Sequence, residues 1–572
     1  MLKKVIKIFY SVSADLKFKI LFLQFLILIN SITQLISILS IGPLIAILSN
    51  YNLENFQFLQ PILNLINFDQ NKNNLTIIFS IFVLVIFTLS NIFSAINYAI
   101  QHRIAQEFDV ELSKKVVEKF FHQKQDTGLK NNSFYFKSLL EKEVSNLITH
   151  VIIPLLDLNS KIVPLIIILA TIFYISPYAS VIVFIFLGIG YTSVYFLIKK
   201  KLKNNSILIS NYLSRNTVIV DDLFKSFKES KIFNFEEFLI NSFVIFKKKI
   251  TKVIGTNLIL HASPKHLFEI LAIFVIVITV VISSLNAEFN SSLPIISVYI
   301  VAGYRIMPNL QSILFASSNI KGASETVNRL YNSIFSKLNS FNNKSNKITE
   351  IKKISLNNFT FKYNDRIIFK NSNIEFKRNI ITGISGESGA GKSTLVDLLI
   401  GFKKIYRGSI SVNGKLIAKN KNTIYKEVSI VPQNIFLLND NLIRNITFQK
   451  YLPNSDYKKL LQILKILKLK NLYKNNKIIN KNIKEFGKNF SGGQIQRIGL
   501  ARALFKNSQI IILDEFTSAL DEHTEQYIFK NLKKLFKNKI IIIISHRNNI
   551  LKKCDTVFLL TNNKIIKTYP KK

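Results

Sequence analysis

The feature that most constrains this chain is a series of long apolar segments before about residue 316. A helix needs about 20 mostly apolar residues to cross a bilayer. Ile270–Ile282 reads ILAIFVIVITVVI and is apolar on every face, which favours a membrane helix over a core helix of a soluble protein. We predict six spanning helices, at Phe18–Leu48, Leu75–Ile100, Leu147–Ile175, Ala179–Ile198, Asn257–Leu285 and Leu293–Phe315.

The placement of lysine and arginine predicts how these helices are oriented, because cytosolic loops of membrane proteins are enriched in both residues. The long connections 101–146 and 199–256 are rich in lysine, whereas 49–74 contains only Lys72 and 286–292 contains no basic residue. We therefore expect a multi-pass protein of a bacterial cytoplasmic (inner) membrane, with both termini and both long connections in the cytosol. Each long connection is expected to carry an element that transmits motion, near 125–136 and near 216–224.

The formal net charge of +42 raises the question of a nucleic-acid partner. The lysines are scattered along the chain rather than gathered into one basic stripe, so we expect no nucleic-acid partner. Cys554 is the only cysteine, which excludes an intrachain disulfide and a cysteine-ligated metal cluster.

The pattern changes after Lys321, where a polar stretch at 339–346 precedes short strand and turn signals. Gly386–Thr394 reads GESGAGKST between an apolar strand and a helical segment, which is the context of a phosphate-binding P-loop. We therefore divide the chain into a transmembrane domain at 1–320, a linker at 321–350 and an α/β P-loop ATP-binding domain at 351–572.

Two motifs in this domain predict the hydrolysis of a nucleoside triphosphate. Glycines allow backbone N–H groups to close on phosphate oxygens, Lys392 is expected to reach the β- and γ-phosphates of ATP, and Ser393 is expected to ligate Mg²⁺. Ile510–Glu515 reads IIILDE and predicts a buried strand that ends in two carboxylates. Asp514 is expected to hold Mg²⁺ through water, and Glu515 to polarise the attacking water. The loop residues assigned to nucleotide binding are Gly386, Ser388, Gly389, Gly391, Lys392, Ser393 and Thr394.

Further motifs resemble those of the ABC transporter family and follow in that family's order. Phe490–Gln494 reads FSGGQ and resembles the family signature, with phenylalanine where leucine is usual. The resemblance implies that Ser491, Gly492, Gly493 and Gln494 bind ATP across a dimer interface. It also implies adenine stacking by Tyr363, magnesium ligation and a catalytic role for Gln433, a D-loop role for Asp521 and a catalytic switch role for His546.

The number of motifs in one chain bears on assembly. One chain contains one P-loop and one signature, and the resemblance implies that each ATP site needs both from different subunits. Two complete sites therefore require two chains. A homodimer is the simplest expectation, and a heterodimer stays open.

Six spans followed by an ATPase domain resemble the exporter branch of this family. Tyr304–Pro308 (YRIMP) and Ser263–Glu269 (SPKHLFE) resemble motifs of the PglK-like lipid-linked oligosaccharide flippases, which tend to have arginine where Lys265 stands. Ser31–Pro43 is also similar, with Gln34 where an acidic residue is common. The resemblance implies ATP-driven flipping of a lipid-linked oligosaccharide, or of another lipid with an anionic head group, across the lipid membrane.

Charged residues inside spans are costly and usually functional. Arg305 lies near mid-span, and either contacts an anionic head group or pairs with a carboxylate of another helix. Asp157 and Lys161 are spaced i, i+4 and are expected to pair with each other. Residues 53–68 are interpreted either as an external amphipathic helix or as a plain loop. The candidate substrate contacts are Arg305, Lys265, His266 and Glu269.

Three other hypotheses are considered. An exporter of peptide, drug-like molecules or bare lipid is the alternative within transport. A soluble ABC ATPase of DNA repair or translation is disfavoured by the six spans. A non-hydrolytic channel or regulator is disfavoured by Glu515 and His546, since a complete catalytic set implies a working ATPase.

Overall fold

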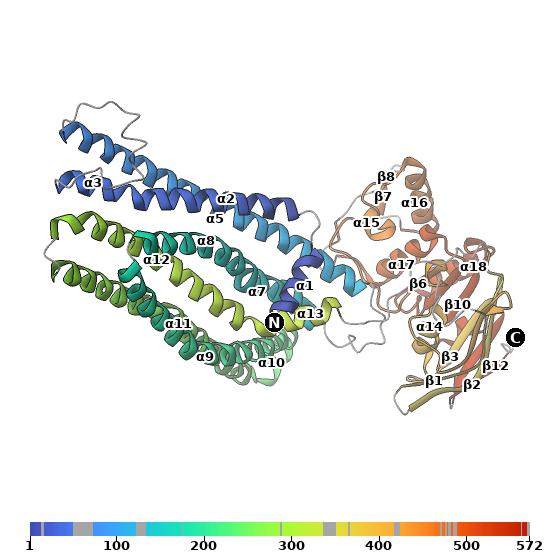
Figure 1. The fold of residues 1–572 in the computed structure, drawn as a ribbon. Coiled ribbons are helices and arrows are strands. Elements are labelled where there is room, and N and C mark those ends of the chain that lie inside the picture. Colours follow the sequence, from blue (N-terminus) through green and yellow to red (C-terminus); the bar gives the residue numbers. More distant parts are fainter. Residues whose placement is uncertain are drawn as a thin grey trace. The chain divides into compact units, whose positions relative to one another are not determined.

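The computed structural model describes residues 1–12, 16–49, 72–121, 133–175, 177–285, 289–335, 350–363, 366–416, 424–469, 472–474, 477–478, 482–483, 489–561 and 563–568. These residues divide into two compact units, here called the helical unit (up to Phe335) and the sheet unit (from Glu350) (Figure 1). The division falls inside the segment 321–350 that we expected to link two domains. Residues 53–68 lie outside the described residues.

The helical unit is built from α-helices and two short π-helical turns, η3 and η4. Its elements are α1 (Leu2–Val12), α2 (Leu16–Leu39), α3 (Ile41–Leu48), α5 (Lys72–Phe121), α6 (Ser133–Ser138), η3 (Leu139–Val144), α7 (Ser145–Leu147), η4 (Ile148–Ile152), α8 (Ile153–Ile175), α9 (Pro177–Lys225), α10 (Phe227–Phe233), α11 (Glu236–Leu285), α12 (Phe289–Gly322) and α13 (Ser324–Phe335).

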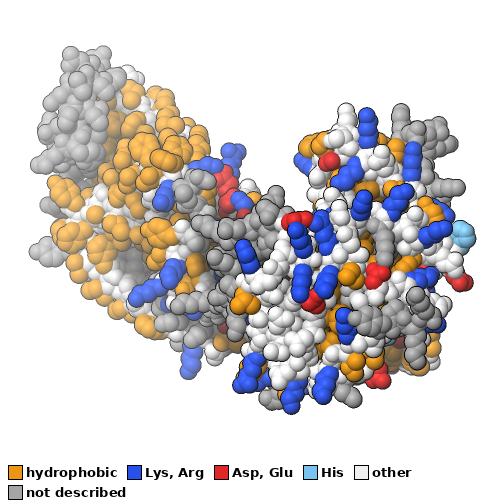
Figure 2. All heavy atoms as spheres, turned by 90° about the vertical axis from the view of Figure 1, so that its right-hand side faces the viewer, with side chains coloured by type: hydrophobic (Ala, Val, Ile, Leu, Met, Phe, Trp, Pro, Cys, Tyr) orange, Lys and Arg blue, Asp and Glu red, His pale blue; other side chains and the backbone are white. Residues whose placement is uncertain are grey.

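All six predicted spans lie on helices, which confirms their helical character. By length and composition, three stretches among the described residues can cross a membrane: Leu16–Leu48, Asn73–Phe121 and Phe136–Ile175. The other three predicted spans coincide with α9, α11 and α12. Apolar side chains cover much of the surface of the helical unit in Figure 2, and lipid rather than water is the solvent that suits them.

The longest helices extend well beyond a bilayer. α5, α9 and α11 contain 50, 49 and 50 residues. At about 1.5 Å per residue, each is roughly 75 Å long, more than twice the ~30 Å hydrocarbon core. The polar parts of these helices, which carry many of the lysines of the two long connections, therefore continue outside the membrane.

The turn of the connection between α9 and α11 lies later in the chain than expected. We expected its transmitting element near 216–224, but α9 runs unbroken through these residues to Lys225. The turn is instead the short helix α10, which ends where Asn234 adopts a left-handed conformation with φ of 54°. The sequence contains no helix breaker near residue 216, which is why α9 continues. Of the other expected element, 125–136, only 133–136 belong to the described residues, and they lie in α6.

Among the described residues, the sheet unit contains one parallel sheet extended by an antiparallel strand, one four-stranded antiparallel sheet, and one antiparallel pair formed by β7 (Tyr473–Lys474) and β8 (Lys477–Ile478). The larger sheet has the order β12 (Lys564–Thr568), β11 (Thr556–Thr561), β3 (Ile381–Gly386), β10 (Ile540–Ile544), β9 (Ile510–Asp514) and β6 (Val428–Val431). Only β12 runs antiparallel to its neighbour. The second sheet has the order β2 (Arg366–Lys377), β1 (Lys353–Tyr363), β4 (Arg407–Val412) and β5 (Lys415–Leu416).

The remaining elements of the sheet unit cover the sheets or connect their strands. They are α14 (Lys392–Ile400), η5 (Ile424–Glu427), α15 (Leu442–Thr447), α16 (Asn454–Ile466), β7 (Tyr473–Lys474), β8 (Lys477–Ile478), α17 (Gly492–Lys506), α18 (Glu522–Leu535) and α19 (Asn548–Leu551).

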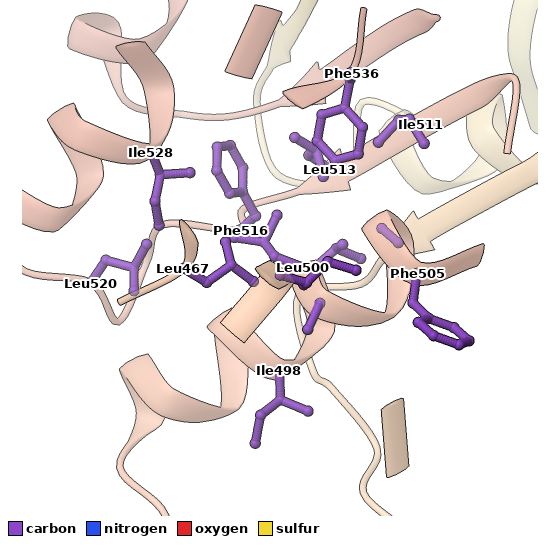
Figure 3. Close-up of a cluster of buried hydrophobic side chains, with 14 of the residues drawn as sticks. Leu467, Ile498, Leu500, Phe505, Ile511, Leu513, Phe516, Leu520, Ile528 and Phe536 are labelled. Carbon is purple, nitrogen blue, oxygen red and sulfur yellow. The ribbon is translucent and has the colours of Figure 1, made fainter. Parts of the chain in front are cut away.

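Both faces of the larger sheet are buried, because successive residues of a strand point to opposite faces. Ile511 and Leu513 of β9 belong to one hydrophobic cluster, and Ile510 and Ile512 belong to another. Figure 3 shows Leu513 beside Phe536 in the first cluster, which also contains Phe516 and, from α17, Leu500. The isoleucine-rich strands are therefore central strands of a doubly covered sheet.

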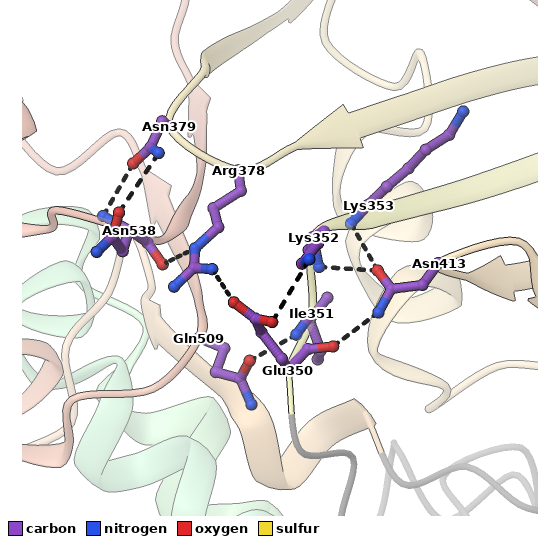
Figure 4. A network of polar contacts seen from close by, with 9 residues as sticks. All are labelled: Glu350, Ile351, Lys352, Lys353, Arg378, Asn379, Asn413, Gln509 and Asn538. Carbon is purple, nitrogen blue, oxygen red and sulfur yellow. Dashed lines mark hydrogen bonds and ion pairs between the residues drawn. The ribbon is translucent and has the colours of Figure 1, made fainter.

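A polar network fixes the start of the sheet unit (Figure 4). The Ile351 N–H donates to Gln509 Oε1 at 2.7 Å, and Asn413 Nδ2 donates to the Glu350 carbonyl at 2.7 Å. The Glu350 carboxylate also pairs with Arg378, whose Nε donates to the Asn538 carbonyl at 2.7 Å. The chain therefore joins this unit at a rigid point.

Two glycines, one in β4 and one in the turn that follows it, allow a matched test of how closely β4 packs against β1. Gly408 and Gly414 both have positive φ, of 97° and 81°. A Cβ on Gly408 would lie 2.6 Å from the Asn357 and Asn358 carbonyl oxygens, whereas none lies within 4 Å at Gly414. Gly408→Ala should therefore destabilise the sheet unit by at least about 2 kcal/mol more than Gly414→Ala, measured by thermal unfolding of the purified protein. Equal shifts in the unfolding temperature would contradict this packing.

Candidate nucleotide site

The predicted P-loop connects the carboxyl end of β3 to the N-terminus of α14. Gly391 caps α14 with φ of 95°, and a Cβ there would lie 2.6 Å from Ile368 Cγ2. Glycine is therefore required both for the backbone conformation and for space. In this arrangement the N-terminal N–H groups of α14 and their dipole point toward the position that a phosphate needs. Ser388 and Ser393 are exposed, whereas Thr394 is buried in α14.

Lys392 reaches back across this loop. Its Nζ donates to the Gly386 carbonyl at 2.8 Å and to the Glu387 carbonyl at 2.9 Å. Partial burial lowers the pKa of Lys392, and the nearby Glu515 and Asp514 carboxylates oppose that shift. The ammonium group is therefore held at the loop, beside the two acids at the end of β9.

Three residues predicted to be catalytic come together although they are far apart in the sequence. Gln433 follows β6, Glu515 follows β9 and His546 follows β10. Gln433 Nε2 donates to Glu515 Oε2 at 2.7 Å, and His546 Nε2 lies 3.5 Å from Glu515 Oε1. The Glu515 carboxylate is therefore oriented from both sides.

Asp514 is the last residue of β9 and lies next to this group. Burial raises the pKa of Asp514, and the Glu515 carboxylate adds to the rise, while Lys392 and His546 act against it. Two adjacent carboxylates repel each other, so a cation between them and the P-loop would favour the ionised form of Asp514.

The signature residues form the N-terminal turn of α17. Ser491 Oγ accepts from the Gln494 N–H at 3.3 Å, and the Ser491 N–H donates to Gln494 Oε1 at 3.0 Å, which is a reciprocal capping box. Gly492 and Gly493 pack against Ala519, since a Cβ at these positions would lie 3.0 Å from Ala519 Cβ and 2.9 Å from the Ala519 carbonyl oxygen, respectively. These glycines therefore bring the signature into contact with the predicted D-loop of the same chain.

Two other predicted residues have local partners. Tyr363 ends β1, and its hydroxyl and ring both contact Lys403, whose Nζ lies 4.6 Å from the ring centroid. Asp521 Oδ1 accepts from the Thr524 N–H at 2.8 Å at the start of α18, and this N–H holds the pKa of Asp521 below its usual range. Tyr363 is 44% exposed, so one face of its ring remains accessible for stacking.

The predicted substrate contacts lie on two helices, and the described ones have different partners. His266 Nδ1 lies 3.3 Å from Glu269 Oε2 on α11, while the side chain of Lys265 lies outside the described part. Arg305 of α12 lies against α5 instead, where its Nη1 donates to Asn91 Oδ1 at 3.4 Å and its guanidinium lies 5.0 Å from the centroid of the Phe87 ring. Arg305 Nε is buried and has no hydrogen-bond partner among the described residues.

Lys161 of α8 belongs to the same neighbourhood. It interacts electrostatically with Asp157 on its own helix and also with Arg305. Asp157 interacts in turn with His102 of α5. Arg305 and Lys161 therefore contribute two cations to a part of the helical unit in which Asp157 is the nearby carboxylate.

The helical unit also contains a cavity of about 370 Å³. Its polar lining includes Lys142, Glu143 and His150 from the π-helical turns and Asn319 from α12, and its walls are otherwise mainly apolar. The Glu143 carboxylate pairs with Arg329 of α13 at 3.3 Å. π-helical turns often mark functional sites because they redirect side chains of a helix.

Sequence reasoning missed three residues that hold the nucleotide site together: Gln496, Arg502 and Arg547. Arg502 Nε and Nη1 donate to the Asn445 and Phe436 carbonyls at 2.5 and 2.6 Å, and burial lowers the pKa of Arg502 to about 10. Arg547 Nη1 donates to Glu525 Oε2 at 2.9 Å. The sequence offers no distinct signal for Gln496, because α17 (GGQIQRIGLARALFK) contains other polar residues close to it.

Comparisons with known proteins bear on the fold and on the kind of ATPase domain that contains this site. Residues 369–518 match the family model described as ABC transporter. An export ATP-binding/permease protein of Rickettsia typhi is 37% identical over 220 residues, which cover 37% of this chain and 38% of that protein. The ATP-dependent lipid A-core flippase of Wigglesworthia glossinidia brevipalpis is 28% identical over 373 residues, which cover 64% of each chain. The alpha-hemolysin translocation ATP-binding protein of Escherichia coli is 34% identical over 223 residues, covering 37% of this chain and 30% of that protein.

The fold is also that of a solved exporter. A bacterial Atm1-family ABC exporter with ATP bound superposes with a TM-score of 0.78 over 97% of this chain and 95% of that chain, at 19% identity. This chain spans 38% of the length of the first relative and 64% of the second. The protein therefore has an ABC exporter fold, with apolar helices typical of a membrane protein and an ABC transporter ATPase domain in the sheet unit.

The first prediction from this geometry concerns Glu515. Glu515→Gln should retain ATP binding but lower the hydrolysis rate by about a hundredfold or more, because the amide cannot accept a proton from water. Hydrolysis and ATP affinity are measured on the purified protein, with Glu522→Gln on α18 as the matched control. Wild-type turnover in Glu515→Gln would remove Glu515 from this role.

The second prediction concerns Lys392. Lys392→Ala should weaken ATP binding roughly tenfold or more, because a charge-assisted contact to phosphate is lost. Lys404→Ala, which removes an exposed lysine of the same unit, should leave affinity unchanged. Equal ATP affinities of Lys392→Ala and the wild type in a titration would refute the assignment.

Proposed function

We propose that this chain is one subunit of a homodimeric exporter that uses ATP hydrolysis to flip a lipid with an anionic head group, most specifically a lipid-linked oligosaccharide. The observation that carries the proposal is the convergence of Gln433, Glu515 and His546 beside the P-loop lysine, in a chain with the fold of an ABC exporter. The names of two relatives, a lipid A-core flippase and a hemolysin translocation protein, support export in general.

The residues around Glu515 fit a nucleotide accompanied by Mg²⁺. Mg²⁺ prefers oxygen ligands and keeps several waters, and Ser393, Gln433 and Asp514 offer a hydroxyl, an amide oxygen and a carboxylate. Gln433 donates its Nε2 to Glu515, which leaves its Oε1 for a cation. The metal, when bound, neutralises charge on the phosphates.

In this mechanism the chain's own residues position the water. Glu515 accepts a proton from the attacking water, and Gln433 and His546 hold its carboxylate in place. Lys392 and the N-terminal N–H groups of α14 bind the phosphates. Tyr363 offers an aromatic face to the base.

Two features support a dimer. One chain provides one P-loop and one signature turn, and in a site shared between subunits Ser491 and the glycines after it bind the ATP held by the other chain. In addition, α10 and the ends of its neighbouring helices expose large apolar side chains: Phe224, Phe227, Ile232, Phe233 and Phe238 are each at least 63% exposed. A second copy is the partner proposed to cover them.

The cations near Arg305 support an anionic cargo. A charged side chain inside a membrane is costly unless it is paired, and Lys161 and Arg305 together exceed the charge of Asp157. The Arg305 Nε, which has no hydrogen-bond partner in the part of the chain that the structure describes, is a further donor. A phosphate or pyrophosphate accepts several hydrogen bonds from one guanidinium, which suits arginine better than lysine.

The cavity lined by Lys142 and His150 supports an amphiphilic cargo. Its apolar walls suit an acyl or prenyl chain, and its basic residues suit a head group. It lies among residues of the long connections that we expect in the cytosol. A lipid taken from the cytoplasmic leaflet of a bacterial inner membrane would reach it from that side.

The test of this proposal is Arg305→Ala in proteoliposomes. It should lower flipping of a lipid pyrophosphate glycan about tenfold or more while basal ATP hydrolysis stays largely intact, and Arg305→Lys should recover little. Arg215→Ala, which removes an exposed arginine of α9, is the control.

Two outcomes would overturn the cargo assignment. In one, Arg305→Ala lowers folded yield but leaves transport per folded protein unchanged, which makes Arg305 structural. In the other, peptide or an uncharged lipid is transported and the lipid pyrophosphate is not.

A further inference from the structure

Gln496 connects two parts of the nucleotide site. It lies in the first turns of α17, the helix that begins with the signature residues, and only 5% of its surface is exposed. Its Nε2 donates to Ser518 Oγ at 2.5 Å and lies 3.5 Å from the Glu515 carbonyl oxygen. Its Oε1 accepts from the Ala519 N–H at 3.0 Å. One amide therefore contacts both ends of the segment 515–519.

This segment needs such support because its backbone is unusual. Glu515 has φ of 46°, a left-handed conformation that is strained for a residue with a side chain. The Ser518 N–H donates to the Glu515 carbonyl at 3.1 Å, which makes 515–518 a tight turn. The direction of the Glu515 carboxylate depends on this turn, and Gln496 is bonded to it.

A second side chain holds the opposite side of the same segment. Arg547, the residue after His546, donates to the Thr517 carbonyl at 3.4 Å and to the Ser518 carbonyl at 3.3 Å. The segment 515–519 is therefore fixed between α17 on one side and the end of β10 on the other. Displacement of α17 cannot leave Glu515 undisturbed unless the bonds of Gln496 break.

We infer that Gln496 is a positioning residue that couples the two ATP sites of the dimer, an inference that rests on the proposed function. In a shared site, the N-terminus of α17 serves the ATP of the partner subunit, while Glu515 serves the ATP of its own chain. Gln496 joins these two parts through bonds within one chain. Closure of α17 on one nucleotide therefore sets the geometry of Glu515 at the other.

The test is Gln496→Met, which keeps the approximate size of the side chain and removes its hydrogen bonds. The full-length dimer is reconstituted and its hydrolysis rate is measured against MgATP concentration. We expect cooperative hydrolysis in the wild type, and in Gln496→Met a kcat about tenfold lower with a Hill coefficient close to 1. ATP affinity at the P-loop, measured by titration, should be unchanged. Gln526→Met, the same change at an exposed position of α18, is the matched control.

Ser518→Ala is a second variant, which removes a hydroxyl that accepts a hydrogen bond from Gln496. Because Ser518 is exposed, this variant keeps the test available if Gln496→Met lowers the yield of folded protein. The two variants should be non-additive in kcat, because they break the same contact. An unchanged Hill coefficient in both variants, or a wild type without cooperativity, would overturn the inference while leaving the proposed function intact. Absence of ATP hydrolysis in the wild type would overturn the proposed function itself, and this inference with it.

Discussion

The nucleotide site depends on the parallel arrangement of β3, β10, β9 and β6 in one sheet. Parallel strands end at the same edge, so the residues that follow them meet there regardless of their separation in the sequence. Lys392, His546, Glu515 and Gln433 are placed by this constraint, each one to six residues after its strand. Successive side chains of β9 point alternately into the hydrophobic clusters on the two faces of the sheet. This burial on both faces keeps the strands in register and holds the edge with the nucleotide site rigid.

Much of this site is predictable from the sequence because its motifs combine glycine geometry with strand ends. The P-loop needs glycine at Gly391, where a side chain has no space, and IIILDE places two acids at a strand end. The contacts that fix the turn 515–519 after the acids were not predictable in the same way. Gln496 and Arg547 act through backbone carbonyls and amides that the fold brings close. A sequence pattern does not indicate which backbone groups Gln496 and Arg547 will contact.

The helical unit was predicted at a coarser level, because apolarity specifies that a segment is a membrane helix but not which helices touch. The spans of α2, α5 and α8 follow from composition. The partners of Arg305 do not follow from composition. We considered a carboxylate of another helix, and the structure gives Arg305 the side chains of Asn91 and Phe87 of α5. The turn at α10 also escaped prediction, since asparagine ends that helix at a position without proline or glycine.

The difference between the sheet unit and the helical unit explains which part of the protein can change its specificity for cargo. In the sheet unit the backbone itself binds phosphate, so few substitutions are compatible with the loop. In the membrane-spanning parts of the helical unit, the exposed apolar side chains face lipid, where one apolar residue can replace another at little cost. We therefore propose that cargo preference rests on the few polar groups away from lipid, such as Arg305, Lys161 and the lining of the cavity. A helical unit of this kind can change its cargo through substitutions at a few residues, while the ATPase domain keeps its nucleotide site at the carboxyl ends of the parallel strands.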